Sequence, residues 1–256
     1  MVGEAAQNLF KDAQTVLQEL IDGNELQAKG VYGFWPANRY GADDIELYTD
    51  DARSERLAVL HHLRQQAPKP NDEAPNYCLA DFVAAQGTPD YVGGFAVTSG
   101  LNIDQILSRY DNDDYAQIMI KALADRLAEA FAEYLHHHVR TSAWGYAAEE
   151  ALSSEELIKE RYQGIRPAPG YPACPEHSEK ETLFKLLSAP ERTGIELTDS
   201  FAMSPAASVS GWYFSHPEAR YFGIGKIDKD QLADYAQRKG VDLETAGVLL
   251  RPSLDD

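Results

Sequence analysis

A proline-rich stretch places the strongest local constraint on how this chain can fold. Residues 166–177 read RPAPGYPACPEH, with four prolines and one glycine in twelve positions. Proline lacks a backbone N–H and fixes φ, so neither a helix interior nor a central strand can run through this stretch. We therefore expect an extended, stiff loop. Such a loop is either a structural turn or a ligand clamp, and the residues alone leave both interpretations open.

Helical and extended segments alternate irregularly on either side of this loop. Apolar residues at three- and four-residue spacing predict long helices over 4–22 and 113–139. Shorter helices are predicted at 153–163, 179–188, 229–240 and 243–250. Strands are predicted at 29–37, 45–49, 55–60, 91–100, 201–216 and 220–227. We also expect a mixed segment at 77–84 and a surface loop at 67–76. This irregular order predicts an α+β fold, with a largely antiparallel sheet flanked by helices. No linker marks a boundary, so we expect a single domain over residues 1–256.

Charge and composition argue against several classes of protein. The chain carries 41 Asp and Glu against 23 Lys and Arg, a formal charge of −18, which disfavours binding to nucleic acid through phosphates. No apolar run approaches the roughly 18 residues of a membrane span, so no membrane partner is expected. Two cysteines, Cys78 and Cys174, do not make a disulfide framework, and a reducing cytoplasm is the expected location.

The residues that most often bind metals or attack substrates are poorly placed for those roles. Histidines occur consecutively at 136–138 and 61–62, and neighbours on a helix point about 100° apart, so no metal site is predicted. His177 follows Cys174 by three positions and makes half a site at most. We expect Cys174 to be a small buried residue rather than a nucleophile. Glycine-rich nucleotide-binding loops of the Rossmann and Walker types are also missing.

The proline-rich loop itself has the composition of a clamp. Arg166 carries a planar fork of donors suited to a carboxylate, and Gly170 allows a close backbone approach or a positive φ. Tyr171 adds a ring face and a hydroxyl at the same place. A later aromatic group is expected to be mostly core, with one face able to line a pocket; its members are Trp212, Tyr213, Phe214, Tyr221 and Phe222.

The loop, preceded by QGI, resembles the Arg-x-x-x-Gly-Tyr loop of the activation domain of cobalamin-dependent methionine synthase. The resemblance extends in order over nearly the whole chain. It includes GVYGFWPANRYGADDIELYTD, HHLRQQ, NYCLADFVA, IMIKALADRLAEAFAEYLH, SFAMSPAASVSGWYFSHPEARYFGIGKI and DYAQRKG.

The resemblance implies a module that binds S-adenosylmethionine and meets the cobalamin held by a neighbouring domain of the same polypeptide. One electron from a reduced flavodoxin-like protein and a methyl group from S-adenosylmethionine would convert inactive cob(II)alamin to methylcobalamin. The implied fold is a single C-shaped α+β domain around a bent antiparallel sheet. As a fragment of 5-methyltetrahydrofolate–homocysteine methyltransferase, the chain is not expected to make methionine alone.

Carried over by position, the resemblance also implies roles for individual residues. Arg166 would hold the methionine carboxylate, Ala168 would hydrogen-bond through its backbone, and Gly170 would allow the ligand to approach. Tyr171 would lie where the ligand faces the corrin, as the nearest candidate for a catalytic residue. Outside the loop, the implied ligand contacts are Tyr221 and Phe222 beside the adenosyl group and Glu129 as a polar contributor.

The sequence departs from the family pattern at its start. The family has an earlier Asp-Trp-x-Pro-Phe-Phe segment that supplies an acidic ligand contact, whereas this sequence begins MVGEAAQNLF. Without that segment, reduced affinity for S-adenosylmethionine is expected. A competing hypothesis is a non-catalytic module that docks the cobalamin domain or a flavodoxin-like donor. A stand-alone methyltransferase is a weaker one, because no general base stands out.

Overall fold

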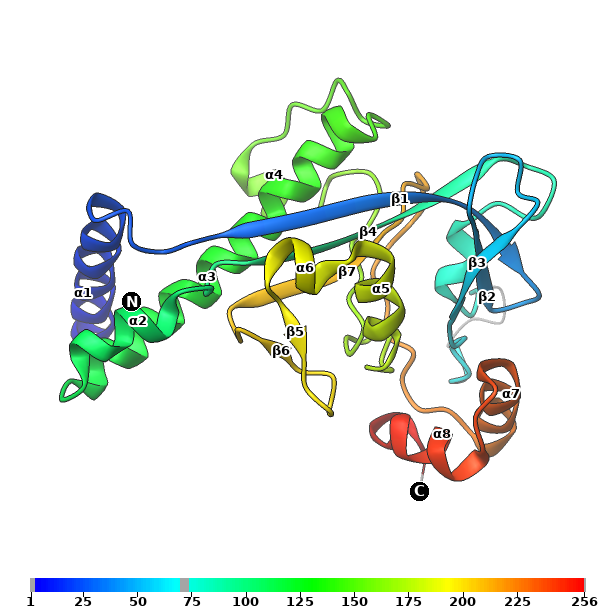
Figure 1. The fold of residues 1–256 in the computed structure, drawn as a ribbon. Coiled ribbons are helices and arrows are strands. Elements are labelled where there is room, and N and C mark those ends of the chain that lie inside the picture. Colours follow the sequence, from blue (N-terminus) through cyan, green and yellow to red (C-terminus); the bar gives the residue numbers. More distant parts are fainter. Residues whose placement is uncertain (1–2, 70–73, 256) are drawn as a thin grey trace. The chain divides into compact units, whose positions relative to one another are not determined.

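The computed structural model describes residues 3–69 and 74–255, and its elements are labelled in Figure 1. The helices are α1 (Glu4–Asp22), α2 (Ile103–Leu107), α3 (Asp114–His138), α4 (Ser154–Ile158), α5 (Glu179–Leu187), α6 (Ala189–Thr193), α7 (Lys229–Lys239) and α8 (Leu243–Leu249). The strands are β1 (Lys29–Tyr40), β2 (Asp44–Tyr48), β3 (Arg56–His61), β4 (Asp90–Thr98), β5 (Glu196–Leu197), β6 (Met203–Ser204) and β7 (Ser208–Tyr213).

Five of these strands form one sheet in the order β3-β2-β1-β4-β7, and β5 pairs with β6 separately. The β1–β2 pair is antiparallel with Ala37 opposite Leu47, and β2 pairs antiparallel with β3. The turn between β1 and β2 contains Gly41 at φ +62°, a conformation that glycine adopts without steric cost. The predicted α+β fold with an antiparallel sheet is confirmed. The C-shaped outline and the domain extent of 1–256 stay predictions.

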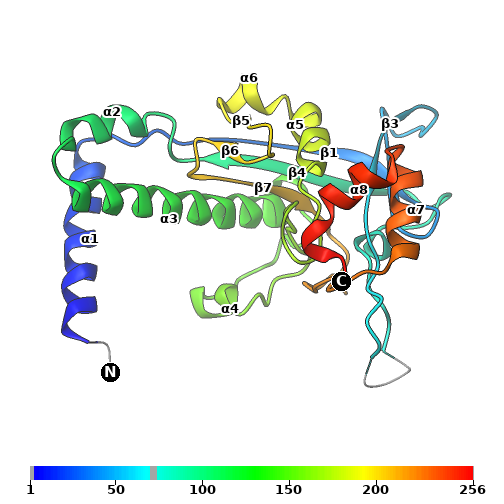
Figure 2. The ribbon, with the colours of Figure 1, turned by 90° about the horizontal axis from the view of Figure 1, so that it is seen from below.

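The chain divides into two compact units. The first consists of residues 1–31, 96–136 and 188–209. Its core joins α1 to α2 and α3 through Leu20, Ile106, Leu107 and Ile120. Figure 2 shows α1 crossing the first turns of α3. Each of these helices has apolar residues along one face, and packing these faces against one another stabilises the unit.

The second unit consists of residues 32–95, 137–187 and 210–256, and it contains the proline-rich loop. Helices α7 and α8 pack together through a buried cluster that includes Leu63, Ile224, Tyr235 and Leu250. The Asp228 side chain accepts the Lys229 N–H at the start of α7, and Gly240 ends the helix at φ +74°.

Most predicted elements are present, and the differences have local causes. The predicted strand 220–227 is wrong: this segment is irregular, and Gly225 lies at φ +75°. The predicted helix 153–163 ends at Ile158, because Glu160 takes a left-handed conformation at φ +53°. Its capping box between Ser153 and Glu156 is confirmed. Part of the predicted loop 67–76, residues 70–73, lies outside the described residues.

Helix length and polarity bear on membrane insertion as well. Among the described residues, no helix combines the length and the apolar composition that crossing a membrane requires.

Candidate functional site

The proline-rich loop begins alongside the end of β7. Ile165 and Phe214 exchange two backbone hydrogen bonds of 3.0 Å, and the Trp212 N–H donates to the Pro167 carbonyl at 2.9 Å. Gly211 permits this close approach, because a Cβ there would lie 2.8 Å from the Pro167 oxygen. The backbone that leads into Arg166 is therefore fixed by the sheet.

A tight turn follows at Gly170, whose φ is +96°. The Gly170 N–H donates to the Cys174 carbonyl at 2.7 Å, and the Tyr171 N–H donates to the Ala168 carbonyl at 3.1 Å. The ring of His177 occupies the space that a side chain would need, since an added Cβ would lie 2.3 Å from it. The loop is thus a structured turn, and glycine is required at its apex for two independent reasons.

Arg166 lies against two tyrosine hydroxyls. Its backbone N–H donates to the Tyr221 Oη at 3.0 Å, and its Nη1 donates to the Tyr162 Oη at 3.2 Å. The two hydroxyl oxygens are 3.4 Å apart. Tyr221 is 37% exposed, whereas Tyr162 is buried with 8% exposed. The structure therefore brings the predicted residues Arg166 and Tyr221 together and adds Tyr162, which sequence reasoning missed.

Tyr171 is exposed at the turn, with 61% of its surface accessible. Ala168 is half-buried and its carbonyl already accepts the Tyr171 N–H. A carbonyl oxygen has two lone pairs, so this backbone group retains capacity for a ligand. The loop presents a ring face and polar backbone on the same turn.

Phe222 packs in an aromatic cluster with Tyr77 and Phe82. Its ring centroid lies 5.8 Å from that of Tyr77 and 6.2 Å from that of Phe82. The adjoining Ile224 N–H donates to the Pro172 carbonyl at 2.8 Å, which joins this segment to the proline-rich loop. The predicted residue Phe222 is thus held beside the loop, and Tyr77 is a second aromatic residue that the sequence did not identify.

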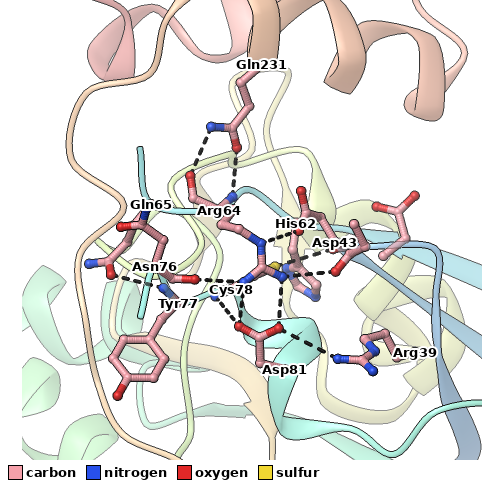
Figure 3. A network of polar contacts seen from close by, with 12 residues as sticks. Arg39, Asp43, His62, Arg64, Gln65, Asn76, Tyr77, Cys78, Asp81 and Gln231 are labelled. Carbon is pink, nitrogen blue, oxygen red and sulfur yellow. Dashed lines mark hydrogen bonds and ion pairs between the residues drawn. The ribbon is translucent and has the colours of Figure 1, made fainter. Parts of the chain in front are cut away.

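A network centred on Arg64 fixes the segment that carries Tyr77 (Figure 3). The Arg64 guanidinium donates to both carboxylate oxygens of Asp81 at 2.7 and 2.8 Å, to Asp43 Oδ1 at 2.8 Å and to the Asn76 carbonyl at 2.7 Å. The neighbouring Gln65 Nε2 donates to the Gly223 carbonyl at 2.7 Å. Charge-assisted bonds from Arg64 therefore hold the segment that carries Tyr77, and a neutral bond from Gln65 holds the segment that carries Phe222.

Two comparisons with known proteins match this chain over most of its length. Residues 1–240 match the sequence family described as vitamin B12 dependent methionine synthase, activation domain. The chain belongs to this family. It is also similar to a solved structure described as the MetH reactivation domain bound to AdoHcy, with 55% identity and a TM-score of 0.95. That similarity covers 100% of this chain and 79% of the other.

This activation domain is therefore a domain of methionine synthase, a methyltransferase. Beneath its proline-rich loop lies a group of buried charges. Lys239 donates to Glu176 at 2.8 Å and to Glu179 at 2.6 Å, and the Ser178 hydroxyl also donates to Glu176 at 2.6 Å. Because Glu176 and Glu179 flank the end of the loop, this group attaches the loop to α7.

Burial and the Lys239 charge compete in setting the pKa of each carboxyl group. Burial opposes ionisation of Glu176, but Lys239 and Ser178 outweigh it and hold the pKa of Glu176 below its usual range. Burial dominates at Glu179 and raises its pKa, although Lys239 acts in the opposite direction. The pKa of Lys239 is raised, because the two carboxylates outweigh its desolvation.

Cys174 is buried, as predicted. Burial raises the pKa of its thiol well above the usual value, and its Sγ lies 4.0 Å from Nδ1 of His62. Burial also lowers the pKa of His62 to about 3. Both groups are therefore neutral near pH 7, and the pair does not supply a thiolate nucleophile. Within residues 3–69 and 74–255, no group of three or more His, Cys, Asp or Glu residues is arranged to hold a metal ion.

Glu129, the remaining predicted site residue, is an exposed residue of α3 in the first unit of the activation domain. The other predicted residues belong to the second unit, so the role of Glu129 stays a prediction. The contacts of Tyr162 with Tyr221, of Tyr77 with Phe222 and of Arg64 with Gln231 were missed because they join residues far apart in sequence. The one local signal for Tyr162 was its position four residues before Arg166. Outside a helix, this spacing does not indicate that two side chains are in contact.

Proposed function

We propose that this activation domain binds S-adenosylmethionine at the loop 166–171, with Tyr221 and Phe222 beside the adenosyl group. The single observation that carries the proposal is the anchoring of Arg166 by Tyr221 through its backbone and by Tyr162 through its guanidinium. The 55% identical structure bound to AdoHcy supports it, because AdoHcy is the product that S-adenosylmethionine leaves after giving up its methyl group.

The residues present fit such a ligand. The planar guanidinium of Arg166 matches a carboxylate, and Gly170 and Ala168 offer backbone at a turn without bulky side chains. A sulfonium cation is attracted to aromatic ring faces, which Tyr171 and Tyr221 present at exposed positions. The formal charge of −18 adds a general attraction for a cationic methyl donor. Glu129 is proposed as an additional polar contributor.

The reaction follows from the ligand. The bound donor would supply a methyl group which, with one electron from a reduced flavodoxin-like protein, would restore methylcobalamin from cob(II)alamin on the neighbouring domain and leave S-adenosylhomocysteine. Arg166 and the loop would hold the donor, and the exposed Tyr171 on the same turn would be the residue nearest the corrin. We further propose a cytoplasmic location, which the free thiols of Cys78 and Cys174 support.

A reactivation assay tests this function. A separate cobalamin domain of methionine synthase, loaded with cob(II)alamin, is mixed with reduced flavodoxin, S-adenosylmethionine and this chain, and its visible absorption is followed. We expect the methylcobalamin spectrum only when both this chain and S-adenosylmethionine are present. Formation of the same amount of methylcobalamin in the absence of this chain would contradict the proposal. Binding of the chain to the cobalamin domain without any methylation would favour the docking module instead.

A further inference from the structure

Tyr162 contacts two guanidinium groups. Its hydroxyl oxygen accepts from Arg166 Nη1 at 3.2 Å, and the Arg166 guanidinium lies 5.9 Å from its ring centroid. The Arg140 guanidinium lies 4.3 Å from the same centroid. A buried tyrosine ring that contacts two cations has little freedom to change rotamer.

The support behind Tyr162 is rigid. Arg140 is fully buried and makes two hydrogen bonds of 2.7 Å to the carboxylate oxygens of Glu150. Bidentate pairing fixes the plane of the Arg140 guanidinium, and that plane supports the Tyr162 ring. A continuous series of contacts therefore runs from Glu150 through Arg140 and Tyr162 to Arg166.

The Tyr162 hydroxyl also lies 3.4 Å from the hydroxyl of Tyr221, which accepts the Arg166 backbone N–H at 3.0 Å. The two tyrosines thus contact the backbone and the side chain of the same arginine. An arginine held in this way loses less rotamer entropy when it binds a ligand than a free side chain does.

We propose that Tyr162 is a positioning residue that orients the Arg166 guanidinium toward the carboxylate of the methyl donor. This inference rests on the proposed function and deepens it, because it assigns carboxylate recognition to a pair of residues rather than to Arg166 alone. Tyr162 reaches the ligand's carboxylate through Arg166, whereas Tyr221 keeps its own hydrogen bond with the Arg166 backbone N–H. Loss of the Tyr162 hydroxyl should therefore weaken binding of ligands that carry an amino-acid carboxylate and leave ligands without one unaffected.

The test uses Tyr162→Phe, which keeps the ring beside the Arg140 guanidinium and removes only the hydroxyl. Two probes are titrated by calorimetry: S-adenosylhomocysteine, which carries the carboxylate, and 5′-methylthioadenosine, which shares the adenosyl thioether but lacks the carboxylate. We expect affinity for S-adenosylhomocysteine to fall about five- to tenfold and affinity for 5′-methylthioadenosine to stay unchanged. In an Arg166→Ala background, Tyr162→Phe should have no further effect on either probe.

Tyr146→Phe is the matched control. Tyr146 belongs to the same unit, and its buried hydroxyl has no hydrogen-bond partner among the described residues, so removing it should leave both affinities unchanged. Thermal unfolding of each variant checks that the fold is retained. An unchanged affinity of Tyr162→Phe for S-adenosylhomocysteine, or an equal loss for both probes, overturns the positioning role. A wild-type chain that binds neither probe overturns the proposed function as well, so the two failures are distinguishable.

Discussion

Replacing Lys239 by methionine is expected to lower the free energy of unfolding by about 3–5 kcal/mol at pH 7. Lys239 is the cation shared by Glu176 and Glu179, whose side chains are 3% and 2% exposed. Methionine fills a similar volume, so the loss comes from leaving two buried carboxyl groups without their counter-charge. Urea unfolding followed by circular dichroism measures the change, and Lys229→Met, an exposed position on the same helix, should change stability by less than about 0.5 kcal/mol.

The loss of unfolding free energy in Lys239→Met should become smaller as the pH falls from 7 toward 5. In the wild type the folded pKa of Glu176 is lowered, so its stabilising contribution is present above the unfolded value of about 4.3 and is lost as the pH falls. Without Lys239, burial raises the folded pKa values of both carboxyl groups. The variant therefore gains relative stability as the pH falls from 7 toward 5 and these groups take up protons. A deficit that stays constant over this range would show that charge pairing is not its cause.

Arg140→Met is expected to cost a similar amount, about 3–5 kcal/mol of unfolding free energy, because it leaves Glu150 buried and unpaired. The Arg140 side chain is 0% exposed and that of Glu150 is 6% exposed. Arg109→Met provides the control, because Arg109 pairs with Glu25 at the surface, where ion pairs contribute about 0–1 kcal/mol. The measurement is again urea unfolding at pH 7.

A double replacement separates the charge from the packing. Arg140→Met combined with Glu150→Leu removes both charges, and we expect it to recover a large part of the stability lost by Arg140→Met. Tyr162 would still lose the guanidinium that supports its ring, so binding of S-adenosylhomocysteine should remain weaker than in the wild type. A double variant no more stable than Arg140→Met would contradict the view that an unpaired Glu150 causes the loss.

Local patterns in the sequence predicted the elements whose signals are themselves local. The helix at 4–22 followed from apolar spacing, and Gly23 ends it. Residues 220–227 were wrongly predicted as a strand because their aromatic and β-branched residues favour one. Its backbone groups instead bond to distant positions, with Ile224 donating to Pro172 and Ile227 to Ser253.

The candidate site also has features that the sequence predicts and contacts that it does not. The proline content of the loop predicted a stiff turn, and the resemblance to a known family identified Arg166 and Tyr221, which the structure places in contact. No local pattern indicates that Tyr162 contacts Tyr221, because 59 positions separate them. Nor does any pattern associate Arg64 with Gln231, 167 positions away. Such contacts are created by tertiary packing, so they become visible only once the fold is known.

Calorimetric titration of S-adenosylmethionine into the wild-type chain and into Arg166→Ala tests the central claim most directly. We expect saturable binding at one site in the wild type and a loss of at least about 1.5 kcal/mol, roughly tenfold in affinity, in Arg166→Ala, as for a charge-assisted hydrogen bond. Arg161→Ala, at an exposed neighbouring position, should bind like the wild type. Equal affinity of the wild type and Arg166→Ala would contradict the account.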